Sequence, residues 1–374
     1  MNTKRDVMPN VFDHYRYLHT IPELGFQEFK TADYLAAQLE AAGYRLTRGV
    51  NGTTGMVAEL NSGAPGPVLA LRADMDALGH IIDGEFCARH TCGHDAHASV
   101  VLTAAQELMR DGVVKKGRLK ILFQPAEELG TGAIAMVEGG AIDDVDMILG
   151  FHLRPVEECQ LGEVIPAMHY SASSTLEVTF HGQPAHGARP HLGVNALEAA
   201  ASAVMAVKAV PLAPHLTWSA KATRFLCDAG VTNSIPDSAT VCWDLRASRN
   251  DAMDELKAKV IRAIEYSAAA YGATAEITLL KEIPAADIHD DATALISAAI
   301  VDVLGEAGLT APKSTAGGED FFFYPRLKPQ IKAGFWGLGT NLKPGLHHPD
   351  MHFELSSLET GVQVFKRCVE KMLG

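Results

Sequence analysis

Three short apolar runs in the first half of the chain each end near side chains that bind cations or move protons. The runs are 67–72, followed by Asp74 and Asp76; 119–123, followed by Glu127 and Glu128; and 147–150, followed by His152. Near-continuous apolar runs are typical of strands covered on both faces, and helical patterns separate these three. Ligands of open α/β sheets bind at the carboxyl ends of the strands. The sequence therefore predicts an α/β fold, a mostly parallel sheet flanked by helices, with a site at that edge.

The segment 91–97, TCGHDAH, adds a metal-binding signal. Cys92 and His94 lie just before a helix predicted over 99–109, where the helix dipole favours a deprotonated thiol. Thiolate and imidazole donors suit Zn²⁺ or a similar transition ion. A buried structural cysteine beside capping residues explains the heptapeptide equally well, so a metal site requires donors elsewhere in the chain.

The chain supplies such donors. The candidate metal ligands are Cys92, His94, Glu128, His152 and His347. Each has a plain structural alternative, because adjacent glutamates are commonly a solvated surface pair, a histidine after a strand is commonly a core residue, and a histidine pair before a proline is commonly part of a turn. The α/β order brings several of the five to one crevice, which favours a shared metal site.

The pattern between residues 170 and 280 is different. Strands are predicted at 175–181, 216–226, 238–245 and 273–279, and helices at 195–210 and 251–271. This β-α-β-β-α-β order is ferredoxin-like and is long enough for a separate, smaller α+β domain. We therefore expect a catalytic domain made of residues 1–169 and 281–374, with an inserted lid or dimerisation domain at 170–280.

Composition excludes several classes of partner. The formal charge of −13 argues against nucleic acid and anionic membranes. No run approaches eighteen apolar residues, and the first twenty residues lack the apolar core of a signal peptide, so neither a membrane span nor secretion is expected. Six cysteines without framework spacing are typical of a reducing compartment, which predicts a cytoplasmic protein.

Eight segments match a known family in the family's order and span nearly the whole chain. They are LHTIPELGFQE (18–28), LRADMDAL (71–78), TCGHDAHAS (91–99), FQPAEE (123–128), GFHL (150–153), PAHGARPHLGVNA (184–196), GGEDF (317–321) and LHHP (346–349). The chain resembles the amidohydrolase branch of the aminoacylase/carboxypeptidase superfamily of metallopeptidases, with its hippurate, auxin-conjugate and aminobenzoyl-glutamate hydrolases. The stretch 79–91 is shorter than usual and resembles a compact bacterial sub-branch, so no particular acyl group or amino acid is carried over.

The resemblance implies two divalent cations (Zn²⁺, Mn²⁺, Co²⁺ or Ni²⁺) held by the five candidate ligands, with Cys92 bridging. It implies Glu127 as the general acid/base, since a carboxylate beside a metal-activated water can take its proton and pass it to the leaving amine. It also implies His186 of the inserted domain as a donor to the oxyanion, often across a dimer. A turn residue is the alternative for His186.

The three aspartates near the motifs have supporting roles in this reading. Asp76 is counted with the catalytic groups, and Asp74 and Asp95 are expected to orient imidazoles from behind. Helix capping or a strand-end salt bridge with Arg72 is the alternative for these carboxylates.

Three further residues are candidates for substrate binding. Asn233 and Arg246 match superfamily positions that recognise a substrate carboxylate, for which arginine offers a bidentate fork. Gly317 lets the backbone approach a ligand closely. A structural ion pair explains Arg246 equally well, and a simple loop explains Gly317.

The sequence therefore predicts a metal-dependent amidohydrolase, acting as a homodimer through the inserted domain, that cleaves an N-acyl amino acid or a related small amide. Two alternatives stay open. A thiol hydrolase would use Cys92 as the nucleophile and His94 as the base, but it leaves Glu128, His152 and His347 without a role. A relative that only binds a metal or ligand would keep the fold without turnover.

Overall fold

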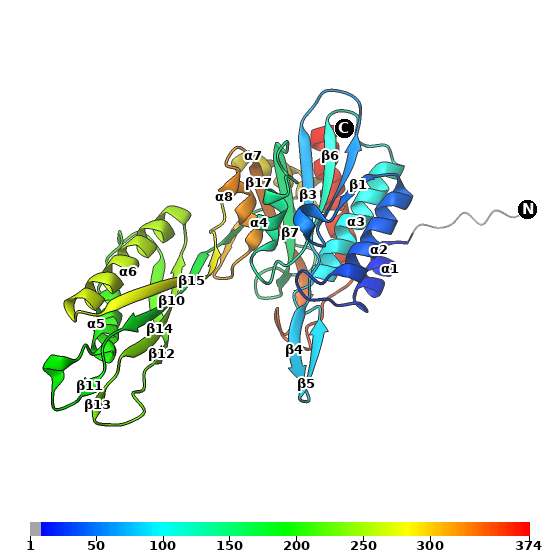
Figure 1. Cartoon of the computed structure of the whole chain (residues 1–374). Coiled ribbons are helices and arrows are strands. Elements are labelled where there is room, and N and C mark those ends of the chain that lie inside the picture. The colour runs from blue at the N-terminus through cyan, green and yellow to red at the C-terminus, as the bar shows by residue number, and fades with distance from the viewer. Residues whose placement is uncertain (1–8) are drawn as a thin grey trace, which may run out of the picture. The chain divides into compact units, whose positions relative to one another are not determined.

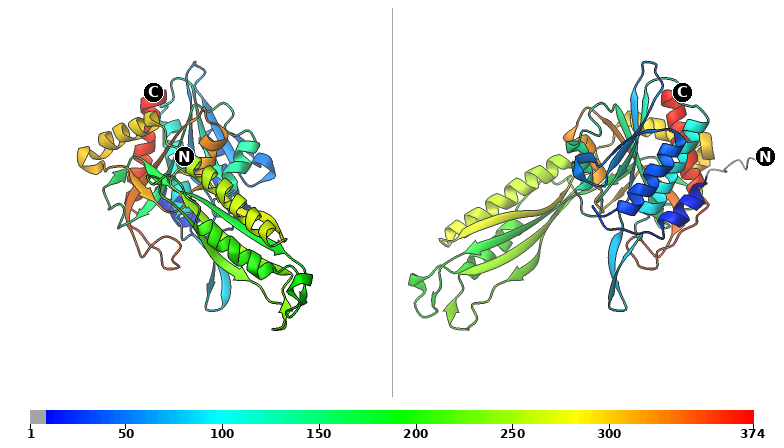
Figure 2. Two further views of the ribbon diagram at one scale, coloured as in Figure 1. Left: turned by 90° about the vertical axis from the view of Figure 1, so that its left-hand side faces the viewer. Right: turned by 45° about the vertical axis from the view of Figure 1, so that its right-hand side comes forward.

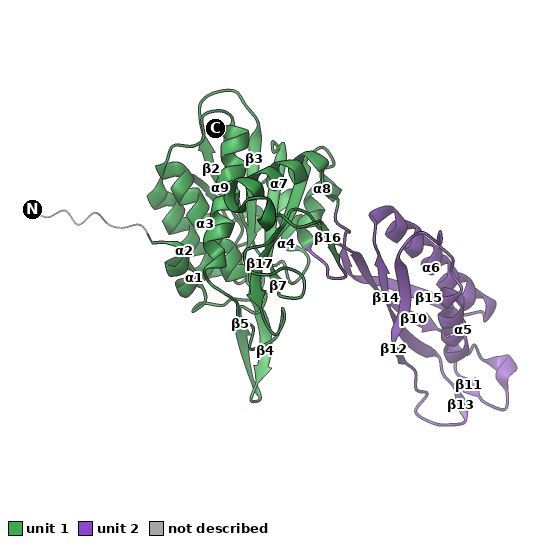
Figure 3. Cartoon of the chain, turned by 180° about the vertical axis from the view of Figure 1, so that it is seen from behind, with its two compact units in different colours: residues 1–169, 287–314, 320–374 green, residues 170–286, 315–319 purple. Residues whose placement is uncertain are grey.

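The computed structural model describes residues 9–374; the first eight residues, part of the segment expected to lack a signal peptide, lie outside the described residues. The chain divides into two compact units, coloured separately in Figure 3. Unit 1 comprises 1–169, 287–314 and 320–374, and unit 2 comprises 170–286 and 315–319. Among the described residues, the helices are all too short or too polar to cross a membrane.

Unit 1 is built on a seven-stranded sheet with the order β1-β2-β6-β3-β7-β17-β8. In chain order its strands are β1 Arg45–Arg48, β2 Met56–Asn61, β3 Val68–Asp74, β6 Arg118–Gln124, β7 Met147–Pro155, β8 Val164–Ile165 and β17 Lys332–Leu342. The four central strands are parallel, and β1, β2 and β8 pair antiparallel at the edges. The predicted α/β fold with a mostly parallel sheet is confirmed.

Helices cover both faces of this sheet (Figures 1 and 2). They are α1 Val11–Leu18, α2 Phe29–Ala42, α3 His94–Arg110, α4 Gly132–Glu138, α7 Asp290–Leu304, α8 Phe323–Leu327 and α9 Ser357–Leu373. Helix α3 is buried on nearly every side between the sheet and its neighbours α1, α2 and α9, and its buried residues include polar ones, among them His94, Asp95 and His97. Leu71, Leu102, Phe151 and Phe365 belong to the core that joins them.

Unit 2 follows the predicted element order. Its elements are β10 Ala172–His181, α5 Ala196–Lys208, β12 Trp218–Leu226, β14 Ser238–Ala247, α6 Asn250–Ala270 and β15 Thr274–Ile283. The strands form an antiparallel sheet with the order β12-β14-β10-β15. Alternate residues of β10 are buried because the two helices cover one sheet face, where Phe180, Trp243 and Leu256 form the core. Short strands β11 Ala185–His186 and β13 Ser234–Ile235 pair beside it.

Two elements differ from the sequence prediction in ways that affect the site. Helix α3 begins at His94 rather than at residue 99, so Gly93, at φ +88°, is the N-cap residue and Cys92 directly precedes it. Strand β7 continues to Pro155, so His152 lies within the strand and not after its end. His152 still lies at the expected edge, because the adjacent strand β3 pairs Leu71 with Leu149 and ends three residues later at Asp74, level with His152.

The stretch 79–91, expected to be a shortened loop, contains a β-hairpin of β4 Leu78–Ile82 and β5 Glu85–Arg89. Asp83 and Gly84 connect the strands with φ of +54° and +85°, as a two-residue type I′ turn requires. The Asp-Gly pair was the available sequence signal. The remaining short elements are β9 Met168–Tyr170, β16 Lys313–Thr315, η1 Val50–Gly52, η2 Pro190–Leu192, η3 Glu306–Gly308 and η4 Asp320–Phe322.

Candidate metal centre

Cys92 and His152 meet at the buried end of the central strands. The Sγ atom of Cys92 lies 3.3 Å from Nε2 of His152. The other ring nitrogen of His152, Nδ1, is 2.7 Å from the carbonyl oxygen of Leu153. A carbonyl only accepts hydrogen bonds, so Nδ1 carries the proton and Nε2 presents its lone pair beside the sulfur. This tautomer is the one that a metal-binding Nε2 requires.

His94, the first residue of α3, is oriented in the same way. Its Nδ1 donates to Oδ1 of Asp76 at 3.1 Å, and its buried Nε2 has no hydrogen-bond partner among the described residues. Carboxylate oxygens of Asp74, Glu127 and Glu128 lie 3.8, 3.9 and 3.9 Å from Nε2. These separations are too long for hydrogen bonds but fit ligands that share a cation, each about 2.0–2.2 Å from it. The donor set therefore fits a transition-metal ion.

The C-terminal part of unit 1 adds His347. Its backbone nitrogen donates to the carbonyl oxygen of Thr91 at 2.7 Å, which holds this loop beside Cys92. The Nε2 atom of His347 lies 3.4 Å from Oε1 of Glu128. His347 also has a φ of +66°, a left-handed conformation that non-glycine residues rarely adopt and that local contacts must maintain.

The structure thus brings all five sequence-predicted ligands into overlapping groups. In the described part of the chain, three of the five groups whose donor atoms lie within 4.8 Å of one another contain these ligands together: Cys92–His94–His152, Cys92–Glu128–His347 and His94–Glu127–Glu128. Figure 1 shows the elements that carry them, α3 and β7 and the segments that follow β6 and β17, in unit 1.

The electrostatics of the group favour a bound cation. Burial, and then Glu128, raise the pKa of the Cys92 thiol well above its usual value. Burial opposes ionisation of His94, but Asp74 and Cys92 outweigh it and raise the pKa of His94 well above normal. The acidic groups around His94 thus stabilise positive charge beside its imidazole. A bound divalent cation would supply that charge and would also keep the Cys92 thiol deprotonated.

Asp76 organises the site through three hydrogen bonds. Besides His94, it accepts from the backbone nitrogens of Glu127, at 3.1 Å, and Glu128, at 3.0 Å. The preceding Ala126 has a φ of +52°, and its nitrogen donates to the buried carboxylate of Glu28 at 2.8 Å. Asp76 therefore positions other groups, whereas the sequence reading counted it with the catalytic residues. Glu28 was not assigned a role, although it is the last residue of the family-matching segment 18–28.

Asp74 supports the site from behind, as the sequence suggested. It accepts from Nδ1 of His97 at 2.7 Å and from Arg72 at 2.6 Å. Burial disfavours its charge, but His94, His97 and Arg72 together hold the pKa of Asp74 well below its usual value. The other nitrogen of His97 accepts from the backbone of Leu153 at 3.1 Å, so both ring nitrogens are used within the protein. His97 is a support for Asp74 that the sequence reading did not assign.

The expectation for Asp95 needs correction. Its carboxylate contacts Nδ1 of His19 at 2.6 Å and accepts from the backbone nitrogen of Ala96. Within residues 9–374, these hydrogen-bond partners of the Asp95 side chain are not candidate metal ligands. The reason is geometric, because Asp95 follows His94 in the first turn of α3 and neighbouring helical residues point about 100° apart. Asp95 orients an imidazole, but not that of a candidate ligand.

A second buried network extends from Asp74 and was also missed. Arg72 donates to Asp320 at 3.0 Å and to Gln124 at 2.9 Å, and Gln124 donates to Asp320 at 2.7 Å. The other Asp320 oxygen accepts from the nitrogen of Ala133 at 3.0 Å. These contacts join β3, β6, η4 and α4 behind the site. The GGED segment contained the signal, but sequence reasoning selected only Gly317 from it.

The remaining candidates belong to unit 2, and two of them are neighbours there. Asn233 directly precedes Ser234, the residue that pairs with His186 between β11 and β13. The backbone carbonyl oxygen of Asn233 accepts a hydrogen bond from the backbone nitrogen of Gly187 at 2.8 Å. Nδ1 of His186 accepts from the nitrogen of Ala188 at 3.1 Å, which places the proton on the exposed Nε2.

Arg246 and Gly317 have plainer surroundings. Arg246 forms a bidentate pair with Asp244, at 2.9 and 3.0 Å, which is the ion-pair alternative. It lies near the end of β14 remote from β13, roughly 26 Å along the strand from Ser238. A side chain at Gly317 would make only ordinary contacts, at 3.8–3.9 Å with residues of unit 2.

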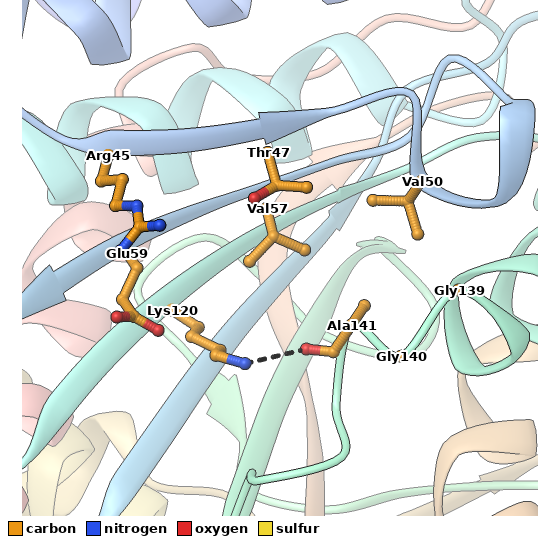
Figure 4. Close-up of a pocket in the computed structure, with 9 residues that line it drawn as sticks. All are labelled: Arg45, Thr47, Val50, Val57, Glu59, Lys120, Gly139, Gly140 and Ala141. Atoms are coloured by element: carbon orange, nitrogen blue, oxygen red, sulfur yellow. Dashed lines mark hydrogen bonds between the residues drawn. The ribbon is translucent and has the colours of Figure 1, made fainter.

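A separate pocket of about 260 Å³ lies over β1, β2 and β6 (Figure 4). Lys120 reaches into it and donates to the carbonyl oxygen of Ala141 at 3.2 Å. Its lining consists of Arg45, Thr47, Val50, Val57, Glu59, Lys120, Gly139, Gly140 and Ala141. None of the sequence-predicted site residues is among them, so this pocket is distinct from the metal centre.

Comparisons with known proteins identify the family of the chain. The sequence profile of peptidase family M20/M25/M40 matches residues 70–371. An N-acetyl-L-cysteine deacetylase of Bacillus subtilis is 30% identical, covering 89% of this chain and 81% of the relative. An indole-3-acetyl-aspartic acid hydrolase of Enterobacter agglomerans is 29% identical, covering 96% and 95%.

Two solved structures resemble the whole chain. A dinuclear metal-binding peptidase of the M20 family from Bacillus subtilis has a TM-score of 0.77 and 26% identity, with 97% of both chains covered. An aminobenzoyl-glutamate utilization protein from Klebsiella pneumoniae has a TM-score of 0.76 and 25% identity, with 96% of this chain and 95% of that chain covered.

Proposed function

The chain belongs to peptidase family M20/M25/M40, in its amidohydrolase branch, and we propose that it hydrolyses N-acyl amino acids with two bound divalent cations. It is a hydrolase of amide bonds, as its relatives are. The names of these relatives specify N-acetylcysteine, indole-3-acetyl-aspartate and p-aminobenzoyl-glutamate, in each of which an amide joins an acyl group to an α-amino acid. That shared bond is the proposed substrate class.

The cations would be held by Cys92, His94, Glu128, His152 and His347, with Cys92 as the bridging ligand. The observation that carries this proposal is the set of overlapping donor groups around His94 Nε2, spaced for a shared ion and not for hydrogen bonds. When bound, the cations would supply Lewis acidity, acidifying a water molecule and polarising the scissile carbonyl. Zn²⁺ suits a thiolate with imidazoles, and Mn²⁺, Co²⁺ and Ni²⁺ are the alternatives.

Glu127 would move the proton. Its Oε2 lies 3.9 Å from His94 Nε2, and its backbone is fixed by Asp76. The two adjacent glutamates would then have different roles, with Glu128 directed to His347 and Glu127 placed to contact a water molecule bound in the same space. The Glu127 carboxylate would take the proton from water and return it to the leaving amine.

Unit 2 would recognise the substrate and complete the site from a second copy of the chain. His186 and Arg246 stand near opposite ends of the unit, separated by most of the length of β14. One copy of unit 2 is therefore unable to present both to one small substrate. A homodimer in which one copy of the chain supplies His186, with Asn233, and the other supplies Arg246 would remove this difficulty. Arg246 would then exchange Asp244 for the substrate carboxylate, and Gly317 would line the site.

Metal removal followed by a substrate panel tests this function. Protein stripped with a strong chelator should lose hydrolysis of N-acyl amino acids and regain it with Zn²⁺, Mn²⁺, Co²⁺ or Ni²⁺. Elemental analysis should give two ions per chain. Full activity of the stripped protein would favour the thiol mechanism through Cys92. Metal binding without turnover across the panel, read by mass spectrometry, would favour a binding protein.

A further inference from the structure

The hairpin β4–β5 is attached directly to the candidate metal centre. Asp76 lies two residues before β4 begins, and Cys92 lies three residues after β5 ends. Figure 1 shows the hairpin projecting from the body of unit 1. Because both of its ends are held by groups of the site, the hairpin stands at the rim of that site.

One face of this hairpin is apolar and exposed. Side chains alternate between the two faces of a strand, so the pairs Ile81–Phe86 and Gly79–Ala88 share one face. Ile81 is 78% exposed and Phe86 is 66% exposed. The Phe86 ring crosses Gly79, standing 2.7 Å from the place a Cβ would occupy, which accounts for the glycine. Most of both large side chains still faces solvent, which is costly on a protruding element.

The apolar face continues toward the candidate catalytic glutamates. Leu24 lies 3.8 Å from the same Cβ position of Gly79, and the backbone carbonyl oxygen of its neighbour Glu23 accepts a hydrogen bond from the backbone nitrogen of Ala77. Leu129, the residue after Glu128, packs 3.0 Å from the Cβ position of Gly25 and is 53% exposed. We name Ile81, Phe86, Leu24 and Leu129 the apolar strip. It leads from the hairpin turn to the residue beside Glu128.

We propose that the apolar strip binds the acyl group of the substrate, so that the enzyme prefers amides of medium-chain or aromatic acids over acetyl amides. This inference depends on the proposed function. In an N-acyl amino acid the amino-acid end carries a carboxylate, and the acyl group is the part that gains from apolar surface. Ile81 lies five residues from Asp76, roughly 16 Å of extended strand, so the strip is long enough for more than an acetyl group.

The metal-loaded full chain should be assayed with acetyl, butanoyl, hexanoyl, octanoyl and benzoyl derivatives of one amino acid that the panel shows to be accepted. We expect kcat/KM to rise about two- to fourfold per added methylene, the upper value corresponding to full burial. Phe86→Ser and Ile81→Ser should each lower kcat/KM for the octanoyl derivative about tenfold. Both should leave the acetyl derivative within about twofold, which also reports that the variants fold.

Phe29→Ser provides the matched control. Phe29 is as exposed as Phe86, at 64%, but lines a different surface with Arg48 and Thr54. It should leave the acyl-chain profile unchanged.

A flat profile in the wild type would overturn the inference, and so would Phe86→Ser lowering all acyl derivatives equally. An unchanged profile in both strip variants, together with an altered mass by light scattering, would overturn it in favour of an interface between two copies. In these cases hydrolysis persists and the proposed function stands. Absence of turnover with every substrate in metal-loaded protein would remove both.

Discussion

Asp76→Asn tests the most specific feature of the site, one carboxylate that orients a candidate ligand and both glutamates. The carboxylate accepts from Nδ1 of His94 and from the backbone nitrogens of Glu127 and Glu128. An asparagine keeps one oxygen that can accept hydrogen bonds. Its NH₂ group replaces the second carboxylate oxygen and would face an N–H donor, with which it cannot form a hydrogen bond. Hydrogen bonds to a charged group contribute about 1.5–3 kcal/mol each to stability. Losing one of the three and weakening the other two should therefore disturb the positions of His94 and both glutamates.

We therefore expect Asp76→Asn to weaken metal binding by about 10- to 100-fold, or roughly 1.4–2.7 kcal/mol. We also expect kcat to fall in protein saturated with metal, because the backbone that carries Glu127 shifts. Competition with a chromophoric chelator gives the metal affinity, and steady-state rates at saturating metal give kcat.

Asp95→Asn is the matched control, since Asp95 is equally buried, lies one residue from His94 and has its side-chain contact with His19. It should leave the metal affinity within about threefold. Equal losses in the two variants would refute the reasoning, because they would show a general effect of removing buried charge. An unchanged affinity in Asp76→Asn would refute it as well.

Three further outcomes are expected. Glu127→Gln should retain both metal ions by elemental analysis and lose about 10²–10⁴ in kcat, whereas loss of the metal would assign Glu127 to binding. The pKa of His19 should exceed 6.5 by NMR titration, because Asp95 accepts its hydrogen bond, an effect that outweighs burial. A raised folded-state pKa stabilises the fold below pH 6.5, and this stabilisation is lost as the pH rises through that pKa; Asp95→Asn should abolish the dependence. Gly132→Ala should lower the free energy of unfolding by about 1–3 kcal/mol or more, since its Cβ would stand 1.6 Å from the carbonyl oxygen of Pro125 in the loop before Glu127. Gly345→Ala, with no atom within 4 Å of the new methyl group, is the control by thermal unfolding, and equal changes in the two would contradict the contact.

The pattern of apolar runs and terminal polar groups was sufficient to predict the α/β fold and the edge at which donors gather. Strands covered on both faces are near-continuous apolar runs, and the carboxyl ends of parallel strands meet at one edge, so local sequence alone indicated the edge at which Glu128 and His152 lie. Motif spacing extended this to Cys92, His94 and His347. The element order of unit 2 could also be predicted, because apolar residues recur at every second position in a half-buried strand and every three to four positions in a helix.

Only the tertiary structure decided how these residues act. The tautomer of His152 depends on the carbonyl of Leu153, and the position of His347 depends on a bond to Thr91 more than 250 residues earlier. The partner of Asp95 is His19 instead of a candidate ligand, because rotation around α3 directs it away from His94. Such roles depend on the directions and distances of individual atoms, and for His347 and Asp95 on contacts between segments remote in sequence, whereas periodicity records only which residues are buried.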